Sequence, residues 1–135
     1  MTSTKYSYQK GAQSERTVMK YLERHGWICF RSAGSGKHGK IDVICIKKGK
    51  VILLDVKYRV TINYVAYENE HLQYLKSIYE NHGVDVYLVA KVKYLPKFYF
   101  MHIKDVQISS GSMTTLNDRD FRERGIPIDR FIELY

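Results

Sequence analysis

The sequence predicts an α/β fold in which a central mixed β-sheet is flanked by helices. Residues 40–58 contain two apolar runs around a glycine turn, which is typical of a β-hairpin. Asp85–Val92 is a continuous apolar run and indicates a buried strand. An amphipathic segment, residues 68–82, lies between them and predicts a helix. This strand–helix–strand order favours a mixed sheet with helices on its faces.

Length and composition indicate one intracellular domain. The 135 residues suit a single domain, 1–135, in which 1–9 are expected to be flexible and 104–135 form a C-terminal extension of unclear role. No apolar run is long enough to span a membrane, and the polar start is not a signal peptide, so we expect a cytoplasmic protein without a membrane partner. Cys29 and Cys45 lack metal-ligand spacing and are expected to be reduced, buried thiols.

The first helix is expected to start near Gly11 and to run to about His25, with Gly26 as its stop. Its apolar stripe consists of Val18, Met19 and Leu22. Glu15 precedes these residues by helical spacings and therefore projects from the same face. Two explanations stay open for this carboxylate: it favours the positive end of the helix dipole, or it points toward a metal site.

Residues 27–31 predict the first strand, and residues 32–40 (SAGSGKHGK) predict a loop. This loop has three glycines and three basic groups, so its backbone N–H groups and cations suit contacts to phosphate. A plain solvated loop is the alternative. The spacing of a Walker phosphate-binding loop is missing, and we expect no nucleotide cofactor.

The hairpin fixes the register of the next two strands if its turn is centred between Lys48 and Gly49. The turn is neither Asn-Gly nor Asp-Gly, so its type stays open. The expected pairs are Ile46 with Val51, Ile44 with Leu53, and Asp42 with Asp55. Because strand side chains alternate between faces, Lys57 shares a face with both aspartates.

Two carboxylates directly opposite each other are destabilising, and both lie in strongly apolar runs. A divalent cation would remove this conflict, because Mg²⁺ or Mn²⁺ prefers carboxylate oxygens. Asp42 and Asp55 are therefore interpreted as metal ligands. The alternative is that both lie on a solvated face and pair with nearby lysines.

The later segments can also be assigned from their patterns. Residues 59–67 are ambiguous between strand and loop, and a second helix follows over residues 68–82. Its core face consists of Leu72, Leu75, Ile78 and Tyr79. Residues 98–103 predict another strand, residues 109–115 a polar loop, and residues 129–135 a short helical or extended end.

A formal charge of +8 favours a nucleic-acid partner, because basic side chains that neutralise phosphates release counterions. The five histidines show no paired spacing typical of zinc sites. No G-x-S-x-G element of a serine hydrolase is present.

The motifs carry a resemblance to known nucleases. Asp42 followed by Asp55-Val56-Lys57 resembles the D…(D/E)-x-K signature of the restriction-endonuclease-like nuclease superfamily. Residues 10–16 (KGAQSER) are similar to the K-G-x-x-x-E-R start of archaeal Holliday junction resolvases. Residues 27–31 with Ser35-Gly36 resemble their next strand and loop. Order and spacing agree over about residues 8–92, and the remaining chain has no counterpart in this resemblance.

This resemblance implies a restriction-endonuclease-like core and a metal-dependent endonuclease that makes paired incisions in four-way DNA junctions during recombination or replication. It also implies a homodimer, with the helix at residues 68–82 in the dimer interface. The expected metal ligands are Glu15, Asp42 and Asp55, which would bind Mg²⁺ with Mn²⁺ as a substitute. The other expected catalytic residues are Lys57 and Ser35, with Ser32 as an alternative to Ser35. The expected DNA contacts are Lys10, Arg16, Arg31, Lys37, Lys40 and Arg59.

Two departures from the resolvase pattern are visible. Asp55 stands where a glutamate is common, which the superfamily signature allows, and His71 stands where related sequences often carry a glutamine. Two other functions stay open: a general repair or restriction-type nuclease of the same fold, and a junction-binding module without catalysis. The complete set of Asp42, Asp55 and Lys57 argues against the second of these.

Overall fold

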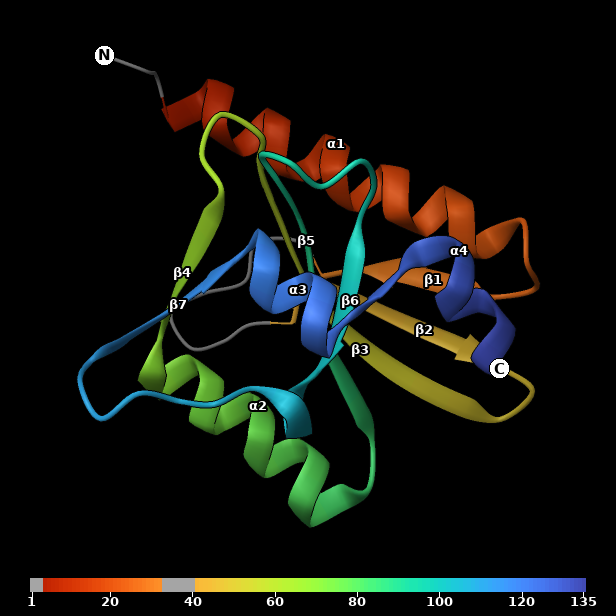
Figure 1. Cartoon of the computed structure of the whole chain (residues 1–135). Helices are drawn as coiled ribbons and strands as arrows, with labels where there is room; N and C mark the ends of the chain where they lie inside the picture. The colour runs from red at the N-terminus through yellow and green to blue at the C-terminus, as the bar shows by residue number, and fades with distance from the viewer. Residues whose placement is uncertain (1–3, 33–40) are drawn as a thin grey trace.

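The computed structural model describes residues 4–32 and 41–135, with side chains from Gly11 onward in the first helix. Within these described residues, six strands form the main sheet in the order β1, β2, β3, β5, β6 and β8 (Figure 1). Their bounds are Ile28–Arg31, Val43–Lys47, Lys50–Arg59, Asp85–Val92, Tyr99–His102 and Ile126–Pro127. β3 pairs with β5 in parallel, and the other neighbours are antiparallel, so the predicted mixed sheet is confirmed.

Helices cover both faces of this sheet. In Figure 1, α1 (Thr4–Glu23) runs along the top of the strands and α2 (Asn69–His82) along the bottom. A separate two-stranded sheet pairs β4 (Tyr64–Glu68) with β7 (Met113–Asn117). The remaining elements are α3 (Asp118–Arg124), α4 (Ile128–Phe131) and the 3₁₀ turns η1 (Ile103–Asp105) and η2 (Ile132–Leu134). The expected α/β architecture is therefore confirmed.

β3 divides the apolar core into two clusters because its side chains alternate between the two faces of the sheet. The cluster on the α1 side contains Ile52, Leu54 and Val56 of β3 together with Val18 and Leu22 of α1. The cluster on the α2 side contains Leu53 of β3 together with Leu72 and Leu75 of α2. Because a strand that is buried on both faces has apolar side chains at consecutive positions, this burial explains the apolar run in the β3 sequence.

The hairpin between β2 and β3 has the predicted register. Ile46 pairs with Val51 and Ile44 with Leu53. The two residues of the turn, Lys48 and Gly49, have φ angles of 48° and 81°. Two positive φ angles in a two-residue loop are the signature of a type I′ turn, which twists in the same sense as the strands. The turn type that the sequence left open is thus resolved.

The first helix is longer than expected. It begins at Thr4 and not near Gly11, so residues 4–9 are helical, and nothing in that stretch is a proline or glycine that would interrupt a helix. Its end follows the prediction: Gly26 has a φ angle of 93°, and its N–H donates to the carbonyl of Glu23. The N–H of Trp27 donates to Leu22, which completes a Schellman cap.

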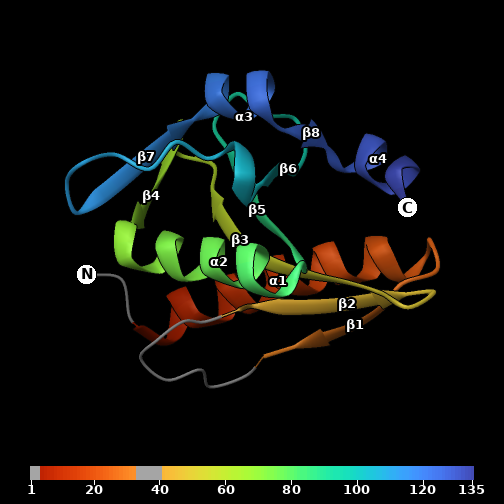
Figure 2. The same cartoon turned by 90° about the horizontal axis from the view of Figure 1, so that it is seen from below.

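The C-terminal segment is an integral part of the domain. Phe121 lies in the cluster on the α2 side, and Ile128 and Phe131 lie in the cluster on the α1 side. These elements, blue in Figure 2, run along the edge of the main sheet, where β8 pairs with β6. β7 also occupies part of the segment that was expected to be a polar loop, because β4 provides a strand partner distant in sequence.

The two cysteines are free and buried, as expected. They lie directly opposite each other in β1 and β2, and the Sγ atom of Cys45 donates to that of Cys29 at 2.9 Å.

Among residues 4–32 and 41–135, no helix is both long enough and apolar enough to cross a lipid bilayer.

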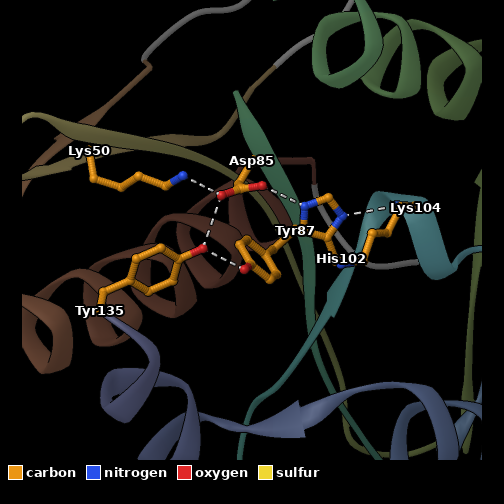
Figure 3. A network of polar contacts seen from close by, with 6 residues as sticks. All are labelled: Lys50, Asp85, Tyr87, His102, Lys104 and Tyr135. Carbon is orange, nitrogen blue, oxygen red and sulfur yellow. Dashed lines mark hydrogen bonds and ion pairs between the residues drawn. The ribbon is translucent and has the colours of Figure 1, made fainter. Parts of the chain in front are cut away.

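A polar network fastens the hairpin and the end of the chain to β5 (Figure 3). The carboxylate of Asp85 accepts hydrogen bonds from Lys50 at 2.7 Å, from His102 at 2.8 Å and from the Tyr135 hydroxyl at 3.2 Å. Tyr135 in turn lies 2.6 Å from the hydroxyl of Tyr87. Burial opposes ionisation of Asp85, but the hydrogen bonds from Lys50 and His102 outweigh it, so the pKa of this carboxyl is lowered.

Replacing Asp85 by asparagine should reduce the free energy of unfolding by about 1–3 kcal/mol at neutral pH, because hydrogen bonds to a charged acceptor are lost. The folded-state pKa of Asp85 is lowered, so its contribution is present above the pKa of the unfolded chain and is lost as pH falls through the folded-state pKa. Urea denaturation at pH 7 and about pH 3 measures this. Asp129→Asn, which removes only an exposed pair with Lys97, is the control. An equal loss at both pH values for Asp85→Asn would contradict the expectation.

Candidate active site

Asp42 is held against β3 by two backbone contacts. Its N–H donates to the carbonyl of Leu54 at 3.1 Å, and its Oδ2 atom accepts the N–H of Val56 at 2.8 Å. Asp55 lies between those two residues on β3 and is buried, with 6% of its surface exposed. Burial, followed by the negative charge of Asp55, raises the pKa of Asp42 to about 7. The structure therefore brings together the two carboxylates that the hairpin register placed opposite each other.

Asp55 has one partnered and one unpartnered oxygen. Its Oδ2 atom lies 2.9 Å from Nε2 of His71, in the first turn of α2. Its Oδ1 atom is buried and has no hydrogen-bond partner among the described residues. A buried carboxylate oxygen without a partner is costly in free energy, and a cation would satisfy it. The sequence marked His71 only as a departure from the resolvase pattern, and its contact with Asp55 appears once the fold brings α2 to β3.

Tyr67 and Lys57 complete the surroundings of the two carboxylates. Tyr67 is buried, and in the described part of the chain its hydroxyl has no partner. Burial and then the charges of Asp55 and Asp42 raise its pKa well above the ordinary value, so the phenol stays protonated. The Nζ atom of Lys57 lies 5.3 Å from the centre of the Tyr67 ring, and its charge opposes the rise in the pKa of Asp42. The ammonium expected beside the aspartates is therefore present.

Glu15 lies near this site, but its carboxylate is already paired with an arginine side chain. Its Oε1 atom accepts a hydrogen bond from Nε of Arg31 at 2.5 Å, and both side chains are largely buried. Its negative charge contributes to the raised pKa of Asp42. Within residues 4–32 and 41–135, no group of three or more acidic, histidine or cysteine side chains is arranged to hold a metal ion. The structure thus shows a pair of converging carboxylates, and the role of Glu15 as a third ligand stays a prediction.

The structure describes four of the other predicted residues: Arg16, Arg31, Ser32 and Arg59. Arg16 and Arg59 are exposed, and Arg59 donates to the carbonyl of Tyr58 at 2.9 Å. Arg31, expected to contact DNA, is the partner of Glu15. Ser32 is exposed at the end of β1. The side chains outside the described residues are those of Lys10, Ser35, Lys37 and Lys40.

Comparison with known proteins identifies the family. The family model described as archaeal Holliday junction resolvase (Hjc) matches residues 6–135. This chain belongs to that family. The match extends to the last residue, so the segment after residue 92, for which the motifs gave no counterpart, also belongs to the family pattern.

Two curated relatives named crossover junction endodeoxyribonuclease Hjc agree with this assignment. The protein of Sulfolobus acidocaldarius is 30% identical over 86 residues, which are 62% of this chain and 60% of that protein. The protein of Methanocaldococcus jannaschii is 31% identical over 87 residues, which are 64% of this chain and 62% of that protein. The chain therefore spans about three fifths of the length of these relatives.

Solved structures confirm the fold of the family. The Holliday junction resolvase Hjc of Archaeoglobus fulgidus superposes with a TM-score of 0.75 at 16% identity, over 90% of this chain and 99% of that one. A bacterial homing endonuclease superposes with a TM-score of 0.50 at 23% identity, over 97% of this chain and 87% of that one. At these identities the similarity establishes the shared nuclease fold.

Without metal, the two carboxylates should destabilise the protein. Asp42→Asn should raise the free energy of unfolding by about 1–3 kcal/mol at pH 8 in chelator, because it removes a buried charge beside Asp55 and keeps an oxygen for the Val56 N–H. The folded-state pKa of Asp42 is raised from 3.8 to about 7, so the wild type loses stability as pH rises across that interval. Urea denaturation at pH 5 and 8 measures the gain. The exposed Asp105→Asn is the control, and a less stable Asp42→Asn protein would refute the expected repulsion.

Proposed function

We propose that this protein is a Holliday junction resolvase, a divalent-metal-dependent endodeoxyribonuclease that makes paired incisions in four-way DNA junctions inside the cell. The observation that carries this proposal is the convergence of Asp42 and Asp55 beside Lys57 in a chain of the resolvase family. The formal charge of +8 supports a polyanionic substrate. Four-way junctions differ from linear DNA in shape and phosphate arrangement, and backbone contacts can recognise that difference.

The residues present fit a hard divalent cation. Asp42 and Asp55 would hold Mg²⁺, with Mn²⁺ as a substitute, because both ions prefer carboxylate oxygens. The fit is supported by the buried, unpartnered Oδ1 atom of Asp55 and by the raised pKa of Asp42, which a nearby cation would lower. When bound, the cation supplies activation of water for attack on phosphorus and neutralises developing charge.

The protein groups around the cation have separate tasks in this proposal. Lys57 donates to the phosphate oxygens on which negative charge develops during attack. His71 holds Oδ2 of Asp55 and so fixes the orientation of that carboxylate, as second-layer partners of metal ligands do. Glu15 assists as a further ligand once Arg31 exchanges its carboxylate for a DNA phosphate, since both anions suit its guanidinium.

The DNA contacts in the proposal come from α1, from β1 and the segment after it, and from the end of β3. Ser35, or Ser32 in its place, approaches the scissile phosphate from the loop that follows β1. Basic side chains on α1, on that loop and at the end of β3 neutralise the flanking phosphates. These side chains are Lys10, Arg16, Arg31, Lys37, Lys40 and Arg59.

The catalytic assignment is tested by cleavage of a four-way junction and of a linear duplex with the same arm sequences. With Mg²⁺, the wild type should cut the junction in pairs of strands and leave the linear duplex intact. Asp55→Asn should lower the rate by roughly 100-fold or more while junction binding persists, because it removes one of the carboxylates that would hold the cation.

The matched control for the cleavage assay is Asp105→Asn, the same change at an exposed aspartate outside the site. It should cut at the wild-type rate. Equal cleavage of junction and linear DNA would replace the proposal with a general nuclease. Junction binding without cleavage in Mg²⁺ or Mn²⁺ would indicate a binding module.

Paired incisions need two active sites, and we propose a homodimer with two-fold symmetry. β1 is an edge strand, and its outward side chains Ile28 and Phe30 are 60% and 53% exposed. Phe30 pairs with Ile44 and Ile44 with Leu53, so these apolar groups continue the surface of the sheet beside α2. Tyr74 of α2 is exposed next to the buried face of that helix. An apolar face of this kind is suited to contact with a second copy.

Phe30→Glu should convert the dimer to a monomer, because it places a charge in the centre of the proposed apolar interface. Sedimentation equilibrium at micromolar concentration measures the change. Leu134→Glu introduces the same charge at another exposed apolar residue, far along the chain, and should leave the dimer intact. A monomeric wild type, or a dimer that tolerates Phe30→Glu, would remove this face from the assembly.

A further inference from the structure

A pocket with a volume of about 310 Å³ lies between α1 and the carboxyl-terminal half of the β3–β5 pair. Its walls are formed by Gln13, Ser14, Thr17, Tyr58, Lys91 and Phe98. The polar side chains come mainly from α1, and the two aromatic side chains come from β3 and from the turn before β6. None of these residues has a role in the catalytic site described above.

Lys91 brings an uncompensated positive charge into this pocket. Its side chain is half-buried on β5, opposite Tyr58 in the register of the sheet. In the part of the chain that the structure describes, no carboxylate forms an ion pair with Lys91. An ammonium without a carboxylate partner is free to bind an anion. The exposed amide of Gln13 adds hydrogen-bond donors at the rim.

Two aromatic side chains also line the pocket, Tyr58 beside Lys91 in the sheet and Phe98. The rings of Tyr58 and Phe98 lie with their centroids 6.1 Å apart. Nucleobases stack on such rings irrespective of sequence, because every base has a π-face. The ammonium and the amide at this pocket therefore match the phosphate of a nucleotide, and the two aromatic rings match its base.

The pocket is separate from the catalytic centre. Tyr58 follows Lys57 directly on β3, and successive strand side chains point to opposite faces of a sheet. Lys57 faces Tyr67 and the aspartates, whereas Tyr58 packs with the cluster on the α1 side. A group bound in the pocket would therefore hold DNA at a distance from the scissile phosphate.

We propose that this pocket is a nucleotide-binding subsite that receives one unpaired nucleotide of the DNA substrate. Lys91 and Gln13 bind its phosphate, and the base lies against Tyr58 and Phe98. This inference rests on the proposed function in so far as DNA is the substrate. It adds a contact that acts on a single-stranded nucleotide and not on the duplex arms.

The full-length protein in chelator, without added metal, is titrated with thymidine 5′-monophosphate, thymidine and inorganic phosphate. Amide NMR spectra should show saturable shifts for residues around the pocket, with the monophosphate binding more tightly than either fragment. Lys91→Gln should weaken monophosphate binding by roughly tenfold, the loss expected for one charge-assisted hydrogen bond. Gln13→Glu, nearly identical in shape and at an exposed position, should weaken it similarly by charge repulsion.

Two matched controls apply the same changes outside the pocket. Lys93→Gln alters an exposed lysine two residues along from Lys91, and Gln73→Glu alters an exposed glutamine on α2. Both should retain wild-type affinity. Shifts confined to the surroundings of Asp42 and Asp55, equal binding of phosphate alone, or equal effects of the controls would overturn the subsite. This titration measures binding and not cleavage. If the subsite is absent, specific monophosphate binding is lost here, whereas a failure of the proposed nuclease function would appear only in the junction-cleavage assay.

Discussion

The crowding of two carboxylates on a doubly buried hairpin is the constraint on which the rest of this structure depends. β3 is covered by α1 on one face and by α2 on the other, so it supplies apolar side chains to both cores. Asp55 interrupts that pattern at a position with 6% exposure. For stability alone an apolar residue would serve better there, since an incompletely paired buried charge costs free energy. In the proposed site, a cation shared with Asp42 would offset that cost.

The neighbours of this pair compensate for only part of its cost. The Val56 N–H and the His71 ring each satisfy one carboxylate oxygen, and Lys57 supplies a positive charge on the same face. These contacts orient the carboxylates but leave Oδ1 of Asp55 without a partner among the described residues. A site built for stability would close the remaining oxygen with another donor. The two acids are instead close together and incompletely hydrogen-bonded among the described residues, which is an arrangement that a cation could complete.

The sequence predicted what local periodicity controls. The hairpin register, the bounds of α2 and β5 and the stop at Gly26 follow from patterns within a few residues of each other, and the structure has them. The contacts of Glu15 with Arg31 and of Asp55 with His71 each join residues 16 apart in different elements, so no local pattern reveals them. β7 escaped prediction for the same reason, because its partner β4 lies far away in sequence. The motifs thus predicted which acidic residues form the candidate site, whereas the hydrogen-bond partners of these acids could be identified only from the fold.

Because the side chains of β3 alternate between the two faces of the sheet, the candidate active site and the proposed nucleotide subsite lie on opposite faces. Lys57 and Tyr58 are consecutive, but one faces the carboxylates and the other faces the pocket under α1. A change on one face leaves the other face intact as long as the strand stays in register, and the register is secured on both sides by β2 and β5. α1 is the element that reaches both regions, since Glu15 approaches Asp42 while Gln13, Ser14 and Thr17 line the pocket. A shift of α1 would therefore move a charge near the catalytic acids and reshape the pocket together. This makes the packing of α1 on β3, through Val18 and Leu22, the physical link between the proposed subsite and the candidate active site.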